Sequence, residues 1–241
     1  MIELYEVGGC VRDALLGIPS KDIDFTVVAS GGWEEMQKFL GKQGFTIWLE
    51  QPEYLTIRAK FPDDFKLASG TDTKGLTADF VLARKENQYT DGRRPDLVTP
   101  GTLEDYLHRR DFTVNALAKS EDGKIIDLFG GVRDLGNGLL RCVGSPEERF
   151  QEDSLRALRA IRFVITKDMT MSPSIIDALG SNWLPPLLAS VSVERRREEL
   201  LRAFRHDTPR TMKLLCQFDK IMQATFADGL SLAPTLEKVK R

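Results

Sequence analysis

Gly8-Gly9-Cys10-Val11-Arg12-Asp13, followed closely by Asp22-Ile23-Asp24, is the stretch that decides how the first half of this 241-residue chain folds. Residues two apart on a strand point to the same face, so Asp22 and Asp24 are expected to project together. Paired carboxylates are costly unless a cation neutralises them, and magnesium prefers hard oxygen ligands. The glycines let backbone amides approach phosphate oxygens ahead of a short helix. The stretch therefore indicates a two-metal phosphoryl-transfer site, although an isolated D-x-D is also compatible with two solvated acids.

Strand-like and helix-like segments alternate around this stretch, and helical segments alone follow it. We predict strands at residues 4–7, 22–28 and 77–84, a hairpin at 45–49 and 54–61, helices at 11–16 and 32–44, and loops at 63–74 and 87–102. Ser145 and Pro146 start a helix whose apolar face is formed by Phe150, Leu155, Leu158, Ile161 and Ile165. Further helices are predicted at 175–179, 194–204 and 209–218, and the boundary between the two halves near 136–143.

The composition is that of an ordinary globular protein with no overall attraction to nucleic acid. Apolar residues make up 41% and charged residues 29%, and the formal net charge is −2. Any RNA binding must therefore come from local basic patches. The last two candidate patches are equally compatible with solvated faces. The candidates are Arg84-Lys85, Arg93-Arg94, Arg109-Arg110, Arg195-Arg196-Arg197 and the tail with Lys238, Lys240 and Arg241.

Cysteine usage predicts a reducing compartment. Cys10, Cys142 and Cys216 lie far apart without C-x-x-C spacing, which favours buried or incidental thiols. Only two histidines accompany them, so no zinc cluster is expected. No apolar stretch reaches the length of a membrane span, and the N-terminus lacks a signal-like segment. We predict a cytoplasmic protein that does not bind membranes.

Four motifs occur in order over residues 5–165. The first combines the stretch quoted above with Leu16-Gly17 and Lys21-Asp22-Ile23-Asp24-Phe25, and the second is Arg109-Arg110-Asp111-Phe112-Thr113-Val114-Asn115-Ala116. The third is Asp127-Leu128-Phe129-Gly130-Gly131 with Asp134-Leu135 and Leu140-Arg141. The fourth runs from Arg149-Phe150 through Glu152-Asp153, Leu155-Arg156 and Leu158-Arg159 to Arg162-Phe163. Together they resemble the class II tRNA nucleotidyltransferase and bacterial poly(A) polymerase family.

The resemblance implies an α+β fold: a nucleotidyltransferase head like that of polymerase beta, with a small mixed sheet and flanking helices, followed by an all-helical neck. We expect the catalytic head in residues 1–138, and in residues 139–241 a neck that selects the base and contacts RNA. It implies two Mg²⁺ ions held by Asp22 and Asp24, CTP and ATP as substrates, and the tRNA 3′ end as partner. No protein partner is indicated. The nucleotide-binding residues it implies are Gly8, Gly9, Arg12, Arg109, Asp111, Asn115, Glu152, Asp153, Arg156 and Arg159.

Chemistry explains how the fourth motif can select a base. On one helix Asp153 and Arg156, three residues apart, are neighbours. A carboxylate accepts from the exocyclic amine of cytosine or adenine, and a guanidinium donates to the adjacent ring nitrogen. Uracil and guanine carry a carbonyl instead of that amine. Glu152, four residues before Arg156, is positioned to hold it. The alternative is an ordinary surface salt bridge.

Three further expectations concern the head. Asp79 occurs where the family carries another acid on a neighbouring strand, so it is a candidate metal ligand or acceptor of the primer hydroxyl proton. Arg109 and Arg110 are candidates for phosphate or ribose binding, or else a basic helix end. Asp111 and Asn115, four apart, are expected to share a polar face that reaches the sugar.

The chain also departs from the family. It ends at Arg241, about where the neck finishes, so we expect the body and tail domains that grip tRNA to be absent. This departure fits three interpretations: a minimal enzyme, a fragment, or a protein that recognises RNA through the basic residues of its neck and tail alone. Residues 192–200 resemble the last neck motif only loosely.

The choice among the family's reactions rests on two segments. The loop at 87–101, with Arg93-Arg94-Pro95, is similar to the flexible loop kept by CCA-adding and A-adding members. Residues 42–48 lack the basic run typical of bacterial poly(A) polymerases. CCA addition therefore ranks ahead of A-only addition, and polyadenylation comes third. A non-catalytic RNA-binding module is the alternative from another class, and nucleotide transfer to a small molecule is a third hypothesis, disfavoured by the base-selecting motif.

Overall fold

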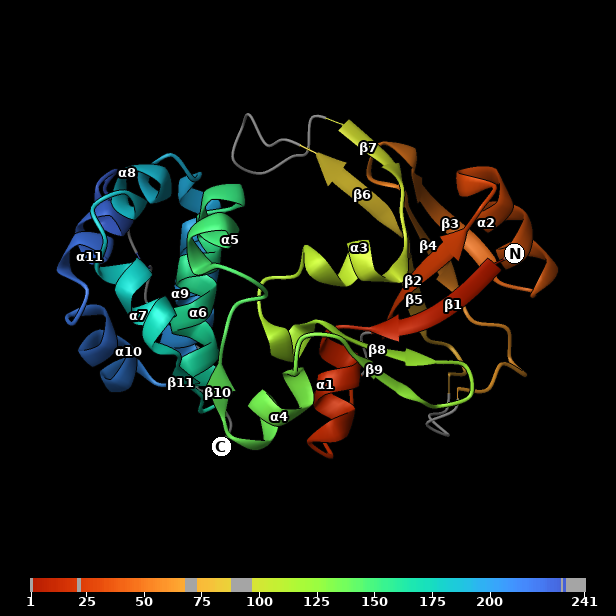
Figure 1. Cartoon of the computed structure of the whole chain (residues 1–241), viewed down its shortest axis with the longest axis horizontal. Coiled ribbons are helices and arrows are strands. Elements are labelled where there is room, and N and C mark those ends of the chain that lie inside the picture. The colour runs from red at the N-terminus through yellow and green to blue at the C-terminus, as the bar shows by residue number, and fades with distance from the viewer. Residues whose placement is uncertain (1, 21–22, 68–72, 88–96, 231, 233–241) are drawn as a thin grey trace. The chain divides into compact units, whose positions relative to one another are not determined.

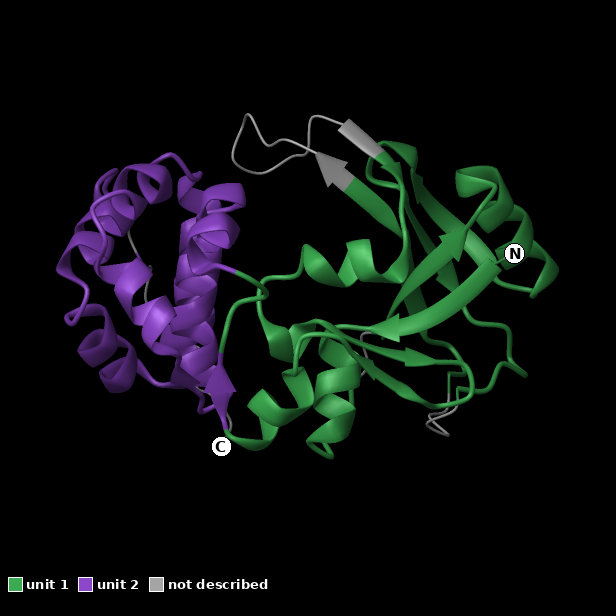
Figure 2. Ribbon diagram, viewed as in Figure 1, with its two compact units in different colours: residues 1–137, 141–144 green, residues 138–140, 145–241 purple. Residues whose placement is uncertain are grey.

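The computed structural model describes residues 2–20, 23–67, 73–87, 97–230 and 232. It forms two compact units, which are coloured separately in Figure 2. Unit 1 contains residues 1–137 and 141–144, and unit 2 contains residues 138–140 and 145–241. The chain thus crosses between the units three times close to the boundary expected between residues 138 and 139.

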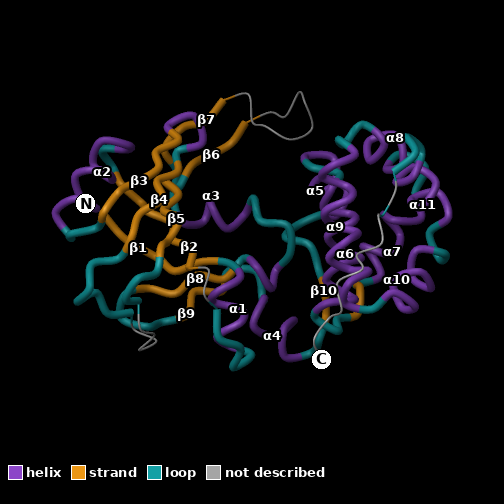
Figure 3. Tube along the Cα trace, turned by 180° about the vertical axis from the view of Figure 1, so that it is seen from behind, coloured by secondary structure: helices purple, strands orange, loops and turns teal. Residues whose placement is uncertain are grey.

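Unit 1 is built on a seven-stranded mixed sheet in the order β3-β4-β5-β2-β1-β8-β9 (Figures 1 and 3). Strands β2 and β5 run parallel, and the other neighbouring strands run antiparallel. The predicted strands and hairpin are confirmed, with small shifts of their ends. The strands are β1 (Ile2–Val7), β2 (Ile23–Ala29), β3 (Thr46–Gln51), β4 (Thr56–Lys60), β5 (Thr77–Leu82), β8 (Leu117–Ser120) and β9 (Ile125–Asp127).

The alternation of residues along β2 gives the sheet two different faces. Ile23, Phe25 and Val27 are buried in an apolar core that also contains residues of α2 (Gly32–Lys42). Phenylalanine rings dominate this core, and those of Phe25 and Phe80 stack with their centroids 5.0 Å apart. Asp24 alternates with these residues and so belongs to the opposite face. Part of that second face packs against Leu107 of α3 (Leu103–His108).

Two parts of unit 1 differ from the sequence-based prediction. The segment expected to be a loop at residues 87–102 contains β7 (Leu97–Pro100), which pairs antiparallel with β6 (Arg84–Asn87). The flanking prolines hid this strand, because proline is typical of loops; residues 88–96 lie outside the described residues. Helix α3 was not predicted either. It begins with a capping box in which Thr102 and Asp105 bond reciprocally.

Short helices connect the strands of unit 1. Helix α1 (Gly9–Leu15) confirms the predicted helix after the two glycines. The others are α4 (Gly131–Gly136) and two 3₁₀ turns, η1 (Pro52–Tyr54) and η2 (Thr113–Asn115).

The described part of unit 2, which ends at residue 232, is helical except for a short parallel pair of strands. Five of its seven helices fall in segments that were predicted to be helical, whereas α8 and α11 were not predicted. The pair is β10 (Leu139–Leu140) with β11 (Thr170–Met171). The helices are α5 (Pro146–Glu152), α6 (Leu155–Thr166), α7 (Pro173–Gly180), α8 (Leu184–Ala189), α9 (Val193–His206), α10 (Thr208–Leu215) and α11 (Asp219–Phe226). Among the described residues, no helix combines the length and hydrophobicity needed to cross a bilayer.

The prediction of one helix from Ser145 to Ile165 is wrong. Ser145 caps the start as expected, its hydroxyl oxygen accepting from the Glu147 N–H. The helix then breaks at Asp153, whose backbone is extended with φ −148° and ψ 100°. Asp153 Oδ1 accepts from the Leu155 N–H, and the Ser154 hydroxyl donates to the Leu187 carbonyl. Such side-chain bonds to the backbone compete with helical ones, and apolar periodicity does not reveal them.

Gly131 joins two of the sequence motifs in unit 1. A Cβ atom at this position would lie 2.1 Å from the carbonyl oxygen of Thr113, far inside van der Waals contact. Asp127 fixes the start of the same helix, because its carboxylate accepts from the N–H groups of Gly131 and Val132. The close approach of α4 to the 3₁₀ turn η2 therefore requires glycine at position 131.

We expect Gly131→Ala to lower the free energy of unfolding by about 1–3 kcal/mol or more, because the new methyl group must displace the backbone of η2. The matched control is Gly136→Ala in the same helix, where a Cβ meets no atom within 4 Å. That change should be neutral or raise the free energy of unfolding by about 0.4–1 kcal/mol. Urea titration of both variants measures the difference, and equal stabilities would contradict the assignment.

Candidate functional site

Two acidic side chains meet at the centre of the unit 1 sheet. Asp24 on β2 lies directly opposite Asp79 on the parallel strand β5. Both line a pocket of about 380 Å³, together with Ile23, Arg58, Thr77 and Ala78. The expectation that Asp79 lies on a neighbouring strand is confirmed. Asp22, the other acid of the sequence pair, lies outside the described residues.

Arg58 adds a positive charge to this pocket. It lies opposite Asp79 in the antiparallel pairing of β4 and β5. Its Nη2 donates to Asp79 Oδ2 at 2.5 Å, and its Nε donates to Oδ1. The side chain of Arg58 is 43% exposed, so solvent weakens this ion pair. Arg58 was not identified from the sequence, although its alternation with Ile57 and Ala59 places it on the polar face of β4.

The donor chemistry of this pocket fits a hard divalent cation. Carboxylate oxygens are the ligands that magnesium prefers, and two carboxylates from adjacent strands face the same pocket. An ionised carboxylate offers about four lone-pair positions, so Asp79 keeps acceptor capacity beside its two bonds to Arg58. Within the described ranges no third acidic, histidine or cysteine side chain completes a metal-binding group.

A buried polar chain links the first motif to the second. Arg12 of α1 donates to the side-chain oxygen of Asn115 and, through Nε, to Asp13 at 2.9 Å. Asn115 Nδ2 donates to Asp111 Oδ1 at 2.9 Å, and the same oxygen accepts from the Phe112 N–H. Arg12, Asn115 and Asp111 are each over 90% buried. The predicted association of Asp111 with Asn115 is confirmed, and the hydrogen bond between the carboxylate and the amide holds both side chains in place.

Two arginines stack on one buried aromatic ring. The guanidinium carbons of Arg109 and Arg110 lie 4.7 and 4.6 Å from the centroid of Tyr106, which is 1% exposed. Arg110 also donates to the Tyr106 hydroxyl. Cation–π contacts of this kind fix guanidinium groups in place. Tyr106 was not identified from the sequence because helix α3 itself was missed.

The two glycines of the first motif border this cationic group. Gly8 precedes α1 with φ +77°, a conformation that favours glycine. A Cβ at Gly8 would lie 3.6 Å from Arg110 Nη2, and one at Gly9 would lie 3.5 Å from Arg12 Nη2. Backbone amides and guanidinium groups thus gather at the start of α1, a combination that suits anions.

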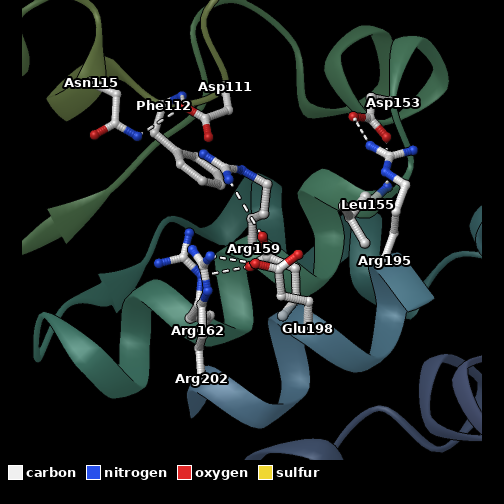
Figure 4. A network of polar contacts seen from close by, with 11 residues as sticks. Asp111, Phe112, Asn115, Asp153, Leu155, Arg159, Arg162, Arg195, Glu198 and Arg202 are labelled. Atoms are coloured by element: carbon white, nitrogen blue, oxygen red, sulfur yellow. Dashed lines mark hydrogen bonds and ion pairs between the residues drawn. The ribbon is translucent and has the colours of Figure 1, made fainter. Parts of the chain in front are cut away.

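Unit 2 carries the residues of the fourth motif. Asp153 sits at the break between α5 and α6, and its Oδ2 accepts from Nη2 of Arg195 on α9 at 2.8 Å, as Figure 4 shows. Because Oδ1 accepts from the Leu155 N–H, both carboxylate oxygens are held. The expectation that Asp153 and Arg156 share one helix is wrong, since Asp153 precedes the first residue of α6.

Glu152 holds Arg156, as the sequence suggested. Arg156 Nη1 donates to Glu152 Oε2 at 2.7 Å and to the Arg149 carbonyl at 3.1 Å. The other oxygen of Glu152 pairs with Arg149 Nη2 at 2.6 Å. One carboxylate therefore bridges two guanidinium groups. Glu152 and Arg149, both on α5, thereby hold the Arg156 guanidinium near the helix break.

The remaining arginines of the neck motifs connect helices. Arg159 and Arg162 of α6 both pair with Glu199 of α9, at 3.5 and 2.5 Å. Arg196 is 1% exposed and donates to the carbonyls of Ala224 and Thr225 at the end of α11. The run Arg195-Arg196-Arg197 is not simply a solvated face, because its first two members make internal contacts; RNA binding by this run stays a prediction. Lys238, Lys240 and Arg241 lie outside the described residues.

The cysteines contribute no reactive group to the pocket. Cys10 and Cys142 are buried and Cys216 is exposed, and all three are free thiols. Burial is the main cause that raises the pKa of the Cys10 thiol, so it remains protonated near neutral pH. The prediction of buried or incidental thiols is confirmed.

Comparisons with known proteins agree with these motifs. The sequence profile of the family described as the poly A polymerase head domain matches residues 4–141. A CCA-adding enzyme of Levilactobacillus brevis is 39% identical over 208 residues, which are 86% of this chain and 47% of the relative. A CCA-adding enzyme of Streptococcus suis is 35% identical over 225 residues, 93% of this chain and 46% of the relative. The chain spans about half the length of the curated relatives it matches.

Solved structures give the same result. The CCA-adding enzyme of Bacillus stearothermophilus in complex with CTP superposes with a TM-score of 0.76 and 31% identity, covering 95% of this chain and 51% of that one. The Thermotoga maritima CCA-adding enzyme complexed with tRNA superposes with a TM-score of 0.72 and 26% identity, covering 96% and 50%. The predicted α+β head followed by helices is confirmed by this likeness and by the elements described above.

Proposed function

This chain belongs to the poly A polymerase head domain family, and from that premise we propose that it transfers CMP and AMP from CTP and ATP to the 3′ end of tRNA without a nucleic-acid template. The relatives it resembles over most of its length are named CCA-adding enzymes. Asp24 and Asp79, in register on parallel strands and lining one pocket, are the observation that carries the proposal.

The carboxylates of Asp22, Asp24 and Asp79 are the residues that would hold divalent cations, which we take to be two magnesium ions. When bound, such ions stabilise negative charge on the attacking and leaving oxygens of the phosphoryl transfer. Asp22 is assigned from the sequence motif. Asp24 and Asp79 are supported by their shared pocket and by the oxygen donors that they supply.

The transfer itself needs positioning and one proton acceptor. The 3′ oxygen of the RNA bonds to the α-phosphorus of the nucleotide, the bond to the bridging oxygen breaks, and pyrophosphate leaves. Asp79 takes the proton from the 3′ hydroxyl through a lone pair that Arg58 leaves available. Gly8, Gly9, Arg109 and Arg110 receive the triphosphate. The buried hydrogen-bonded side chains of Arg12, Asn115 and Asp111 orient the ribose.

Base selection falls to Asp153 and Arg156. Asp153 accepts from the exocyclic amine of cytosine or adenine, and Arg156 donates to the neighbouring ring nitrogen. Arg195 and Glu152 support this role by holding the carboxylate and the guanidinium in fixed directions. A base with a carbonyl in place of the amine meets an acceptor and is rejected.

We expect the 241-residue chain, with magnesium and labelled nucleotides, to extend a tRNA that lacks its CCA end. Asp24→Ala should lower the rate on the order of a thousandfold, since several kcal/mol of transition-state stabilisation depend on the cations. Asp79→Asn should lower it roughly 10²- to 10⁴-fold through loss of the proton acceptor. The control is Asp64→Ala, which removes an exposed acid of the same unit.

Background incorporation by the wild-type chain, or an unchanged rate in Asp24→Ala, would contradict the proposed activity. Binding of tRNA without incorporation would favour an RNA-binding module. Sequencing the extended ends on tRNAs that stop before C, after C and after CC separates the possible reactions. CCA addition completes all three substrates, A-only addition extends the last one, and polyadenylation adds long tails.

The cytoplasmic location expected from the sequence stays a prediction.

For base selection, we expect Arg156→Ala to reduce the preference for CTP and ATP over UTP and GTP by roughly 10- to 150-fold. This is the effect of losing one hydrogen bond to a charged group. Values of kcat/KM for the four nucleotides measure it. Arg202→Ala is the control, because Arg202 is half-exposed on α9 and pairs with exposed Glu198. A variant that still discriminates as strongly as wild type refutes the role given to Arg156.

A further inference from the structure

A row of side chains crosses four neighbouring strands on the face of the sheet that carries Asp24. Asp24 on β2 lies opposite Asp79 on β5, and Asp79 lies opposite Arg58 on β4. Arg58 in turn contacts Trp48 on β3, with its guanidinium carbon 5.7 Å from the ring centroid. These strands are consecutive in the sheet, as Figure 1 shows, so the row runs from the catalytic pocket to the sheet edge.

Trp48 lies on this face by the alternation of β3, because its neighbour Ile47 faces the core. The register between β3 and β4 shifts between Ile47 and Leu49, which leaves Trp48 as the extra residue. Ile47 packs into the core on the other face, whereas Trp48 is 56% exposed. Such irregularities often occur near active sites. Trp48 thus leaves most of its ring open to solvent at the edge of the sheet, next to Arg58.

Two basic side chains share the face of Trp48, and one of them, Arg58, is also paired with Asp79. Arg58 and Lys60 are both exposed, and they alternate along β4 with the buried residues Ile57 and Ala59. They therefore share the face of Trp48. Glu50 lies on β3, the strand of Trp48, and accepts a hydrogen bond from Gln37 of α2. Helix α2 covers the opposite face of the sheet. An exposed aromatic ring beside two cations is the arrangement on which proteins stack the bases of single-stranded nucleic acid.

We propose that Trp48 stacks on a base next to the reacting 3′ end of the RNA primer, with Arg58 and Lys60 beside its phosphates. The proposal rests on the proposed function, because that function places the primer hydroxyl at Asp79. Beyond Asp79 the row continues through β4 to β3, about 10 Å away at two strand spacings. A base next to the reacting 3′ end is therefore within reach of Trp48.

The test uses a short single-stranded RNA that ends in CC, with no nucleotide present. Trp48 fluorescence is followed in the full chain carrying Trp33→Phe and Trp183→Phe. We expect the RNA to quench this emission with saturation. In filter binding, Trp48→Leu should weaken the affinity roughly 5- to 150-fold, the usual effect of losing one stacked base. Trp48→Phe should retain most of the affinity, because it keeps a stacking ring.

Ile176→Ala, which removes an exposed apolar side chain of unit 2, is the control and should bind RNA like wild type. In the extension reaction, Trp48→Leu should raise KM for RNA by a similar factor while kcat and KM for CTP stay close to wild type. Equal RNA affinity in Trp48→Leu and Ile176→Ala, or no quenching by RNA, would overturn the inference. Quenching by RNA in a chain that incorporates no nucleotide would refute the proposed function, and with it the position next to a reacting 3′ end, while showing that Trp48 binds single-stranded RNA.

Discussion

The register of two parallel strands is the constraint on which the rest of the molecule depends. It sets Asp24 of β2 directly across from Asp79 of β5, so two negative charges face one pocket. Like charges this close destabilise the fold unless a counter-charge is present. Arg58 supplies one such charge on the next strand. The buried aromatic core on the other face holds both strands rigidly, and it contains Phe25 and Phe80, which follow the two acids in sequence.

In the proposed function, side chains of unit 2 that hydrogen bonds hold in fixed positions select the base in place of a template. Asp153 lies at a helix break with both carboxylate oxygens bonded, and Arg156 is held by Glu152. Groups that are locked in this way present one pattern of acceptors and donors, and a base with the opposite pattern leaves them unpaired. The interhelical pairs of Glu199 with Arg159 and Arg162 support this arrangement by joining α6 to α9. In the proposed function, selectivity would therefore depend also on residues that touch no nucleotide.

Features with a local signature were predictable from the sequence. The alternation along β2, the glycines before α1 and the serine-proline start of α5 each report on their own segment, and all three are confirmed. Features that depend on contacts distant in sequence were not predictable. The break at Asp153 arises partly from a bond between Ser154 and Leu187, and the burial of Arg196 depends on the end of α11. Arg58, Tyr106 and Trp48 likewise gain their meaning only from neighbouring elements.

The binding of Mn²⁺ followed by electron paramagnetic resonance tests the central claim most directly, because it reports on the cations without any reaction. Titrations of wild type and Asp24→Asn are compared with and without CTP. We expect wild type to bind Mn²⁺ more tightly when CTP is present, and Asp24→Asn to lose most of this binding while its circular dichroism stays unchanged. Equal Mn²⁺ binding by the two proteins in the presence of CTP would contradict a cation site built on the carboxylates of this sheet.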